Sequence, residues 1–106
     1  MANVPDSSNF YSSLQTALSA EQIAGLFRAQ GWQVRETDTD RFELACPWAK
    51  LVVESESPVL LHGPVADVQA NAERVLAVLR KAGVAFTAES FDAGGELLRE
   101  WKSDPA

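Results

Sequence analysis

The stretch from Val65 to Ala82 constrains the fold of this chain more than any other pattern in its sequence. Pro64 before it suits the first turn of a helix, and Gly83 follows it where a left-handed helix cap belongs. The pattern therefore predicts an amphipathic helix over Val65 to Ala82 that must cover an apolar surface. Its apolar residues recur at the spacing of one helical face: Val65, Val68, Ala72, Val75, Leu76 and Leu79.

An earlier helix is predicted over Ala20 to Gln30. Ser19 and Gln22 have the spacing of a capping box, in which each side chain bonds the backbone of the other residue. Gly31 then stands where the helix should end. Apolar residues between these two signals keep the helical spacing, so this segment is expected to cover the same surface as the later helix.

Short stretches with an apolar residue at every second position predict strands, since successive side chains of a strand point to opposite faces. The residues Thr37 to Asp40 form a polar turn between the first two strands, and Pro47 should end the second because it lacks the N–H that a ladder needs. The segment Glu96 to Lys102 fits a strand or a short helix. The other expected strands lie near 32–35, 41–46, 50–56, 59–62 and 84–91.

The expected order of elements is therefore αββββαββ, which is an α+β pattern. We expect a single two-layer domain over residues 14–102, with a mainly antiparallel sheet and both helices packed on one face. Residues 1–13 are rich in Ser, Asn and Pro and are expected to form a flexible tail, and residues 103–106 a second one. The other face of the sheet is left open.

Composition excludes several classes of partner. Fifteen acidic against nine basic residues give a net charge of −6, which repels nucleic acid and anionic membranes. The first eighteen residues lack a secretory leader pattern, and no window has the apolar length of a membrane span. The lone Cys46 agrees with a reducing compartment. These features favour a cytoplasmic protein.

The chain lacks the motifs of common catalytic sites: Gly-x-Ser-x-Gly, Gly-x-Gly-x-x-Gly, the phosphate-binding loop and His-Glu-x-x-His. The only thiol and the only imidazole are Cys46 and His62, and their alternation with neighbouring residues places them on opposite faces of the sheet. We therefore predict no catalytic residues, no metal site and no cofactor, and favour a protein that is not an enzyme.

The main functional hypothesis is binding of a protein partner, or of a second copy as a homodimer, through the open face or an exposed edge strand. Arg35 and Glu43 are expected to pair across the first hairpin. Trp48, Val52, Leu60 and Glu54 are the predicted partner-binding residues, because an aromatic and apolar group among polar ones is typical of a protein-binding surface. Trp48 is expected at the border of the face, and packing of its ring against the core is the alternative. The face should carry Gln33, Arg35, Arg41, Glu43, Ala45, Lys50, Val52, Glu54, Leu60, His62, Ala85, Thr87 and Glu89.

A small-molecule site is the alternative hypothesis. Its pocket would lie between the second helix and the sheet, and the protein would act as a binding protein or an enzyme. His62 would serve as an acid or base near neutral pH, and Gly63 would let a ligand approach the backbone. The sequence alone leaves both hypotheses open.

Overall fold

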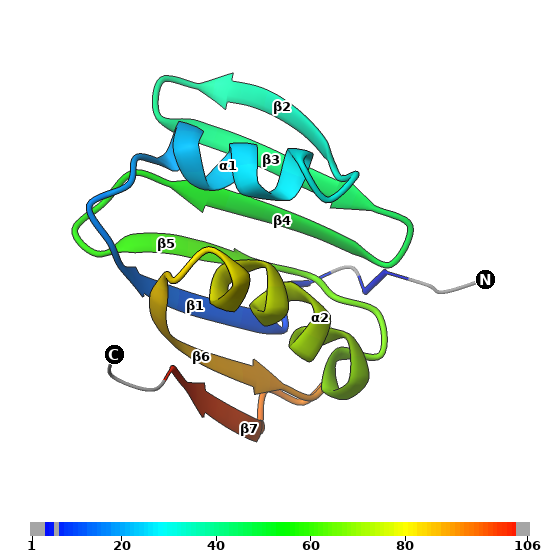
Figure 1. Ribbon diagram of the computed structural model, residues 1–106. Coiled ribbons are helices and arrows are strands. Elements are labelled where there is room, and N and C mark those ends of the chain that lie inside the picture. Colours follow the sequence, from blue (N-terminus) through cyan, green and yellow to red (C-terminus); the bar gives the residue numbers. More distant parts are fainter. Residues whose placement is uncertain (1–3, 6, 104–106) are drawn as a thin grey trace.

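Seven strands and two helices make up the described part of the chain (Figure 1). The computed structural model describes residues 4, 5 and 7–103. The elements are β1 (Phe10–Gln15), α1 (Ala20–Arg28), β2 (Gln33–Asp38), β3 (Arg41–Cys46), β4 (Ala49–Glu54), β5 (Val59–Gly63), α2 (Val68–Lys81), β6 (Ala85–Phe91) and β7 (Leu97–Lys102).

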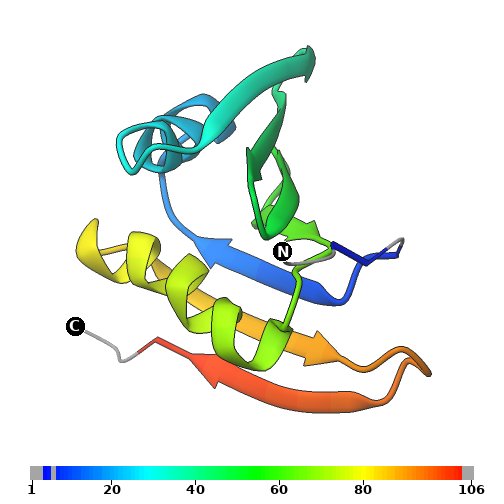
Figure 2. The ribbon, with the colours of Figure 1, turned by 90° about the vertical axis from the view of Figure 1, so that its right-hand side faces the viewer.

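All strands belong to one sheet in the order β2-β3-β4-β5-β1-β6-β7, and each strand runs antiparallel to its neighbours. Both helices lie on the same side of this sheet, α1 over β2 to β4 and α2 over the half that contains β6 (Figures 1 and 2). The predicted α+β class, with two helices on one face, is confirmed. The opposite side of the sheet, called the open face below, is covered by neither of the two helices.

The structure corrects the last part of the tail expected over residues 1–13, because β1 begins at Phe10 and lies inside the sheet between β5 and β6. Residues 1–3 and 6 of that tail lie outside the described residues. Two serines within β1 disguise it, since serine is not typical of buried strands. Ser12 is buried there, and its hydroxyl donates a hydrogen bond of 3.0 Å to the Thr87 carbonyl oxygen. Phe10 and Leu14 on either side of it are fully buried.

The C-terminal segment is a strand rather than a helix, which decides the question left open for Glu96 to Lys102. Ser103, expected in a tail, still belongs to the sheet: its backbone N–H donates to the Phe86 carbonyl, and its hydroxyl accepts from the Phe86 N–H. The remaining residues of the expected C-terminal tail, 104–106, lie outside the described residues.

Helix α2 begins at Val68 instead of Val65. The side chain of Asn9 accounts for the difference, because its amide accepts from the Val65 N–H at 2.8 Å and donates to the Val65 carbonyl at 2.9 Å. These two bonds hold Val65 extended, with a bridge to Ala49, so the helix cannot include it. Helix α1 begins at Ala20 with the expected capping box.

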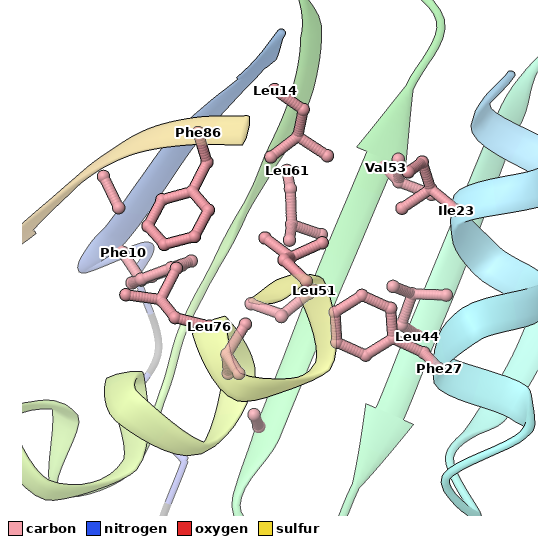
Figure 3. Close-up of a cluster of buried hydrophobic side chains, with 14 of the residues drawn as sticks. Phe10, Leu14, Ile23, Phe27, Leu44, Leu51, Val53, Leu61, Leu76 and Phe86 are labelled. Carbon is pink, nitrogen blue, oxygen red and sulfur yellow. The ribbon is translucent and has the colours of Figure 1, made fainter. Parts of the chain in front are cut away.

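The core lies between the helix layer and the sheet (Figure 3). Alternate residues of each strand point into it, because period-two alternation in a sheet meets the 3.6-residue stripe of a helix. Its largest fully buried side chains are Phe10, Phe27, Phe86, Leu14, Ile23, Leu44, Leu51, Leu61, Leu76, Leu79, Val53 and Val65.

Glu73 fastens the edge strand β7 to helix α2. Its carboxylate accepts a hydrogen bond of 2.7 Å from the indole N–H of Trp101 and forms ion pairs of 3.0 Å with Arg80 and 3.4 Å with Arg99. Trp101 is thereby held against the core beside Phe10. The bonds from Arg80 and Trp101 lower the pKa of Glu73.

Gly63 permits close packing between β5 and β4. Its φ is +153°, and a Cβ there would collide with the Lys50 carbonyl oxygen and lie 2.9 Å from the Leu51 Cα. We expect Gly63→Ala to lower the free energy of unfolding by about 2–4 kcal/mol, measured by urea denaturation. In the control Gly25→Ala, the new Cβ meets open space on α1. That change should stabilise the protein by about 0.5–1 kcal/mol, and equal effects at the two positions would contradict the packing described.

Replacing Glu73 with Gln should make stability less dependent on acid pH. The lowered pKa means that the contribution of Glu73 is present above the pKa of the unfolded chain and is lost as pH falls through the folded value. Because the side chain is 41% exposed, we expect a difference of only about 0.5–1 kcal/mol at neutral pH, shrinking to zero in acid. Unfolding of both proteins across a pH series measures it, and a constant difference would refute the assignment.

Candidate functional site: the open face of the sheet

The predicted set of open-face residues is confirmed by the register of the strands. Gln33, Arg35, Glu43 and Ala45 stand opposite one another across β2 and β3, and their alternate neighbours point into the core. The same alternation continues through the whole sheet. One row of directly opposed residues crosses it from edge to edge and is called the central row: Arg35, Glu43, Val52, His62, Tyr11, Glu89 and Glu100.

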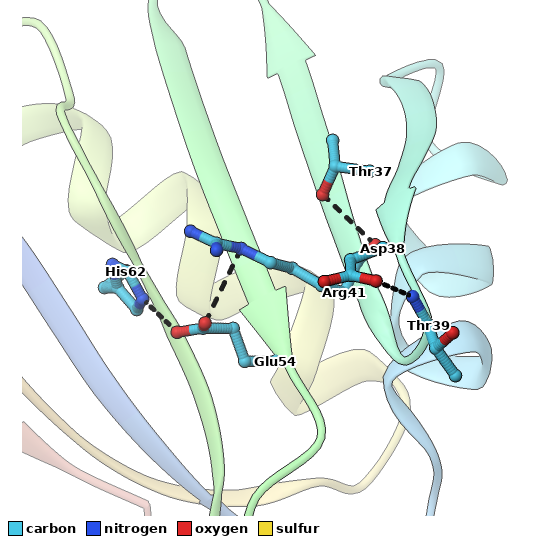
Figure 4. Close-up of polar contacts among 6 residues, drawn as sticks. All are labelled: Thr37, Asp38, Thr39, Arg41, Glu54 and His62. Atoms are coloured by element: carbon cyan, nitrogen blue, oxygen red, sulfur yellow. Dashed lines mark hydrogen bonds and ion pairs between the residues drawn. The ribbon is translucent and has the colours of Figure 1, made fainter.

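A carboxylate and an imidazole meet at the middle of this face (Figure 4). The Nε2 atom of His62 lies 2.7 Å from the Oε2 atom of Glu54, and the other Glu54 oxygen lies 3.5 Å from the Nε atom of Arg41. The His62 and Glu54 side chains are each about one quarter exposed, at 25% and 26%. Because a carboxylate only accepts hydrogen bonds, this contact requires the proton of His62 to sit on Nε2.

Tyr11 is the principal residue of the open face that the sequence reasoning missed. Its ring stacks on His62 with centroids 6.0 Å apart and meets the edge of Phe91 at 5.6 Å. Tyr11 is 44% exposed, and a groove of about 320 Å³ runs beside it, lined also by Phe91, Ser8 and Asp92. The alternation of Phe10, Ser12 and Leu14 around it was the signal that could have revealed a strand here.

Val52 and Leu60 are half-buried on the same face. In the register, Val52 stands opposite His62, and Leu60 stands opposite Glu54. These two opposed pairs lie next to each other on the open face, and the contact between Glu54 and His62 runs diagonally between them. Val52 and Leu60 therefore lie on either side of the polar pair. Three of the four predicted partner-binding residues, Val52, Glu54 and Leu60, are therefore brought together.

Trp48, the fourth, lies on the helix side of the sheet. Its ring contacts Trp32 edge-on with centroids 5.3 Å apart, and the guanidinium of Arg74 from α2 lies 4.5 Å from its ring centroid. The expected position of Trp48 at the border of the open face is wrong, because Ala66 donates a backbone hydrogen bond to the Trp48 carbonyl and holds this turn against the entry to α2.

Two charge pairs on the open face are satisfied within the chain. Arg35 and Glu43 form the predicted pair at 2.7 Å, and Arg41 shares Glu54 with His62. At the other side of the face, Glu89 of β6 and Glu100 of β7 stand directly opposite each other. Like charges in this position repel, so the β6–β7 side of the face is locally acidic and mildly destabilised.

His62 does not lie in the place that the small-molecule hypothesis requires, between α2 and the sheet. His62 points to the open face, whereas α2 covers the other side, where Leu61, Leu76 and Phe86 fill the space beneath it. Gly63 is buried with its Cα facing the backbone of β4, so its missing side chain gives room to the protein itself and not to a ligand.

The thiol and the imidazole are on opposite sides of the sheet, as predicted. Cys46 is half-buried and packs against the core on the helix side. Burial raises the pKa of the Cys46 thiol. This effect is larger than the lowering of the pKa by the hydrogen bonds that the sulfur accepts from the backbone N–H groups of Trp48 and Ala49. A protonated thiol on the far side of the sheet cannot act with His62 as a nucleophile and base.

Within residues 4, 5 and 7–103, no three acidic, histidine or cysteine side chains gather in a way that would hold a metal ion. None of the described helices has the length and apolarity to cross a membrane.

Comparison of the chain with family models, with curated proteins and with solved structures found no match. The open face presents an aromatic ring, two apolar side chains and a polar pair whose partners are already bonded. That arrangement can hold a surface of matching shape.

The reactivity of Cys46 tests its described environment. Because burial raises its pKa, less thiolate is present near neutral pH, and the thiolate is the reacting species. We expect iodoacetamide to modify the folded protein roughly tenfold more slowly than the chain unfolded in urea at the same mildly alkaline pH. Equal rates in the two states would show that the thiol is neither buried nor shifted.

Proposed function

We propose that this chain is an acidic, non-catalytic module that binds another protein through the open face of its sheet. The observation that carries the proposal is the placement of both helices on one side of a seven-stranded sheet, so that no described element covers the other side. A sheet face without a covering layer that also carries an exposed aromatic ring and half-buried apolar groups is typical of an interaction surface.

The chemistry of the face supports a polypeptide as its occupant. Val52, Leu60 and Tyr11 supply apolar contact area near the centre, and protein interfaces are commonly apolar at the core and polar at the rim. The polar groups of the same region, Glu54 and His62, already bond each other. A partner can therefore cover them without leaving the Glu54 carboxylate unpaired, which is the costly event at an interface.

The net charge of −6 argues against nucleic acid and anionic lipid as the occupant. We also place this activity in the cytoplasm, because the single cysteine is a free thiol, as is usual in a reducing compartment. The small-molecule alternative is less well supported, since it requires His62 beneath α2 and the side chain lies on the other face.

A site-specific crosslinking experiment identifies the partner. A photoreactive amino acid at position 60, on the open face, is compared with the same amino acid at position 77, where Ala77 is exposed on α2. We expect a protein that crosslinks from position 60 and not from position 77, in cells of the source organism.

Binding of that purified protein is then measured by titration calorimetry. Leu60→Asp should weaken it by roughly 30-fold, because a charge would be buried at the centre of the interface. Ala77→Asp adds the same charge outside the face and should leave affinity unchanged. Equal crosslinking from both positions, or full affinity in Leu60→Asp, would overturn the proposal.

A further inference from the structure

Among the described residues, β7 is an edge strand whose outward backbone groups pair with no other strand. The N–H of Phe91 bonds the carbonyl of Asn9, so the backbones of Phe91, Glu89 and Thr87 face β1. The N–H of Ser103 bonds the carbonyl of Phe86, which places the alternate residues of β6 toward β7. By the same alternation, the N–H and C=O groups of Glu100 and Lys102 point away from the sheet.

The side chains along this edge select one occupant. In an antiparallel pair formed by β7 and β7 of a second copy, opposed side chains lie on the same face of the combined sheet. A residue of the open face can therefore oppose only another residue of the open face. The register that opposes Glu100 to Lys102 of the second copy places two opposite-charge pairs symmetrically about Trp101.

The neighbouring registers oppose like charges. If the twofold axis of the dimer passes at Glu100 instead of Trp101, the two Glu100 side chains oppose each other. Each of them also faces Glu89 of its own chain. Moving the axis to Arg99 sets the two Arg99 side chains against each other. The charges of β7 therefore favour a single register of self-pairing, and Glu100 gains the cationic neighbour that its own chain does not place directly opposite it.

The other edge strand, β2, lacks this complementarity. The N–H of Ser55 donates a hydrogen bond to the carbonyl of Asp40, which shows which residues of β3 bond β4 and which bond β2. By alternation, the backbone groups of Val34 and Glu36 then point away from β3, toward the outside of the sheet. Self-pairing centred on β2 would oppose either the two Arg35 or the two Glu36 side chains. Both edge strands have an irregular register at one end, β2 between Glu36 and Asp38 and β7 between Arg99 and Leu97, so the opposed charges distinguish them and the irregularity does not.

We propose that a second copy of this chain pairs with β7, antiparallel and in the register of Glu100 with Lys102, to give a homodimer with one continuous sheet. Because the second sheet lies in the plane of the first, the helices of both copies stay on one side and both open faces remain uncovered. The dimer is therefore independent of the protein binding proposed for the open face.

Charge exchange tests the register. Sedimentation velocity from micromolar to near-millimolar concentration should show a monomer–dimer equilibrium for the native chain. Glu100→Lys and Lys102→Glu should each weaken dimerisation roughly tenfold or more, because each replaces two attractive pairs with two repulsive ones. The double variant Glu100→Lys/Lys102→Glu restores opposite charges and should restore the dimer.

Two controls separate this proposal from misfolding and from the open-face function. Glu36→Lys makes the same charge change at the β2 edge and should leave the dimer intact, as should Leu60→Asp. Glu100→Lys places a lysine opposite Glu89 within one chain, so its folded monomer should be at least as stable by thermal unfolding. A native chain that stays monomeric, single variants that dimerise normally, a folded double variant that does not dimerise, or loss of the dimer in Glu36→Lys would overturn the proposal.

Discussion

The insertion of β1 between β5 and β6 is the interaction on which the rest of the structure depends. β2 to β5 form one run of neighbouring strands, β6 and β7 form another, and only β1 joins them. Phe10 and Leu14 are buried in the core, and the Ser12 hydroxyl donates a hydrogen bond to the Thr87 carbonyl. The uncovered side of the sheet is continuous because this one strand is in place.

Much of the fold follows from local pattern. The helix of Val68 to Lys81 follows from the spacing of its apolar residues, and the hairpin around Thr37 to Asp40 follows from its turn residues. Both signals lie within the segments themselves. β1 is different, because its serines are acceptable only where distant strands surround them. The late start of α2 has a similar cause: Asn9 lies far away in sequence and captures Val65 through two hydrogen bonds, which no helical periodicity can reveal.

The candidate site divides in the same way. Val52, Glu54, Leu60 and His62 were placed on one face by alternation alone, and the register confirms it. Tyr11 was missed together with its strand. Trp48 was misplaced because its side chain follows a turn, and turns impose no alternation; its position depends on Trp32 and on Arg74 of α2.

The chain has one cysteine and one histidine, and the sheet lies between them. Each side of the molecule therefore carries its own spectroscopic handle. A fluorophore or spin label on the thiol would sense the layer beneath the helices, while the imidazole resonances would report on the opposite surface, so rearrangements on the two sides can be followed separately in the unmodified sequence.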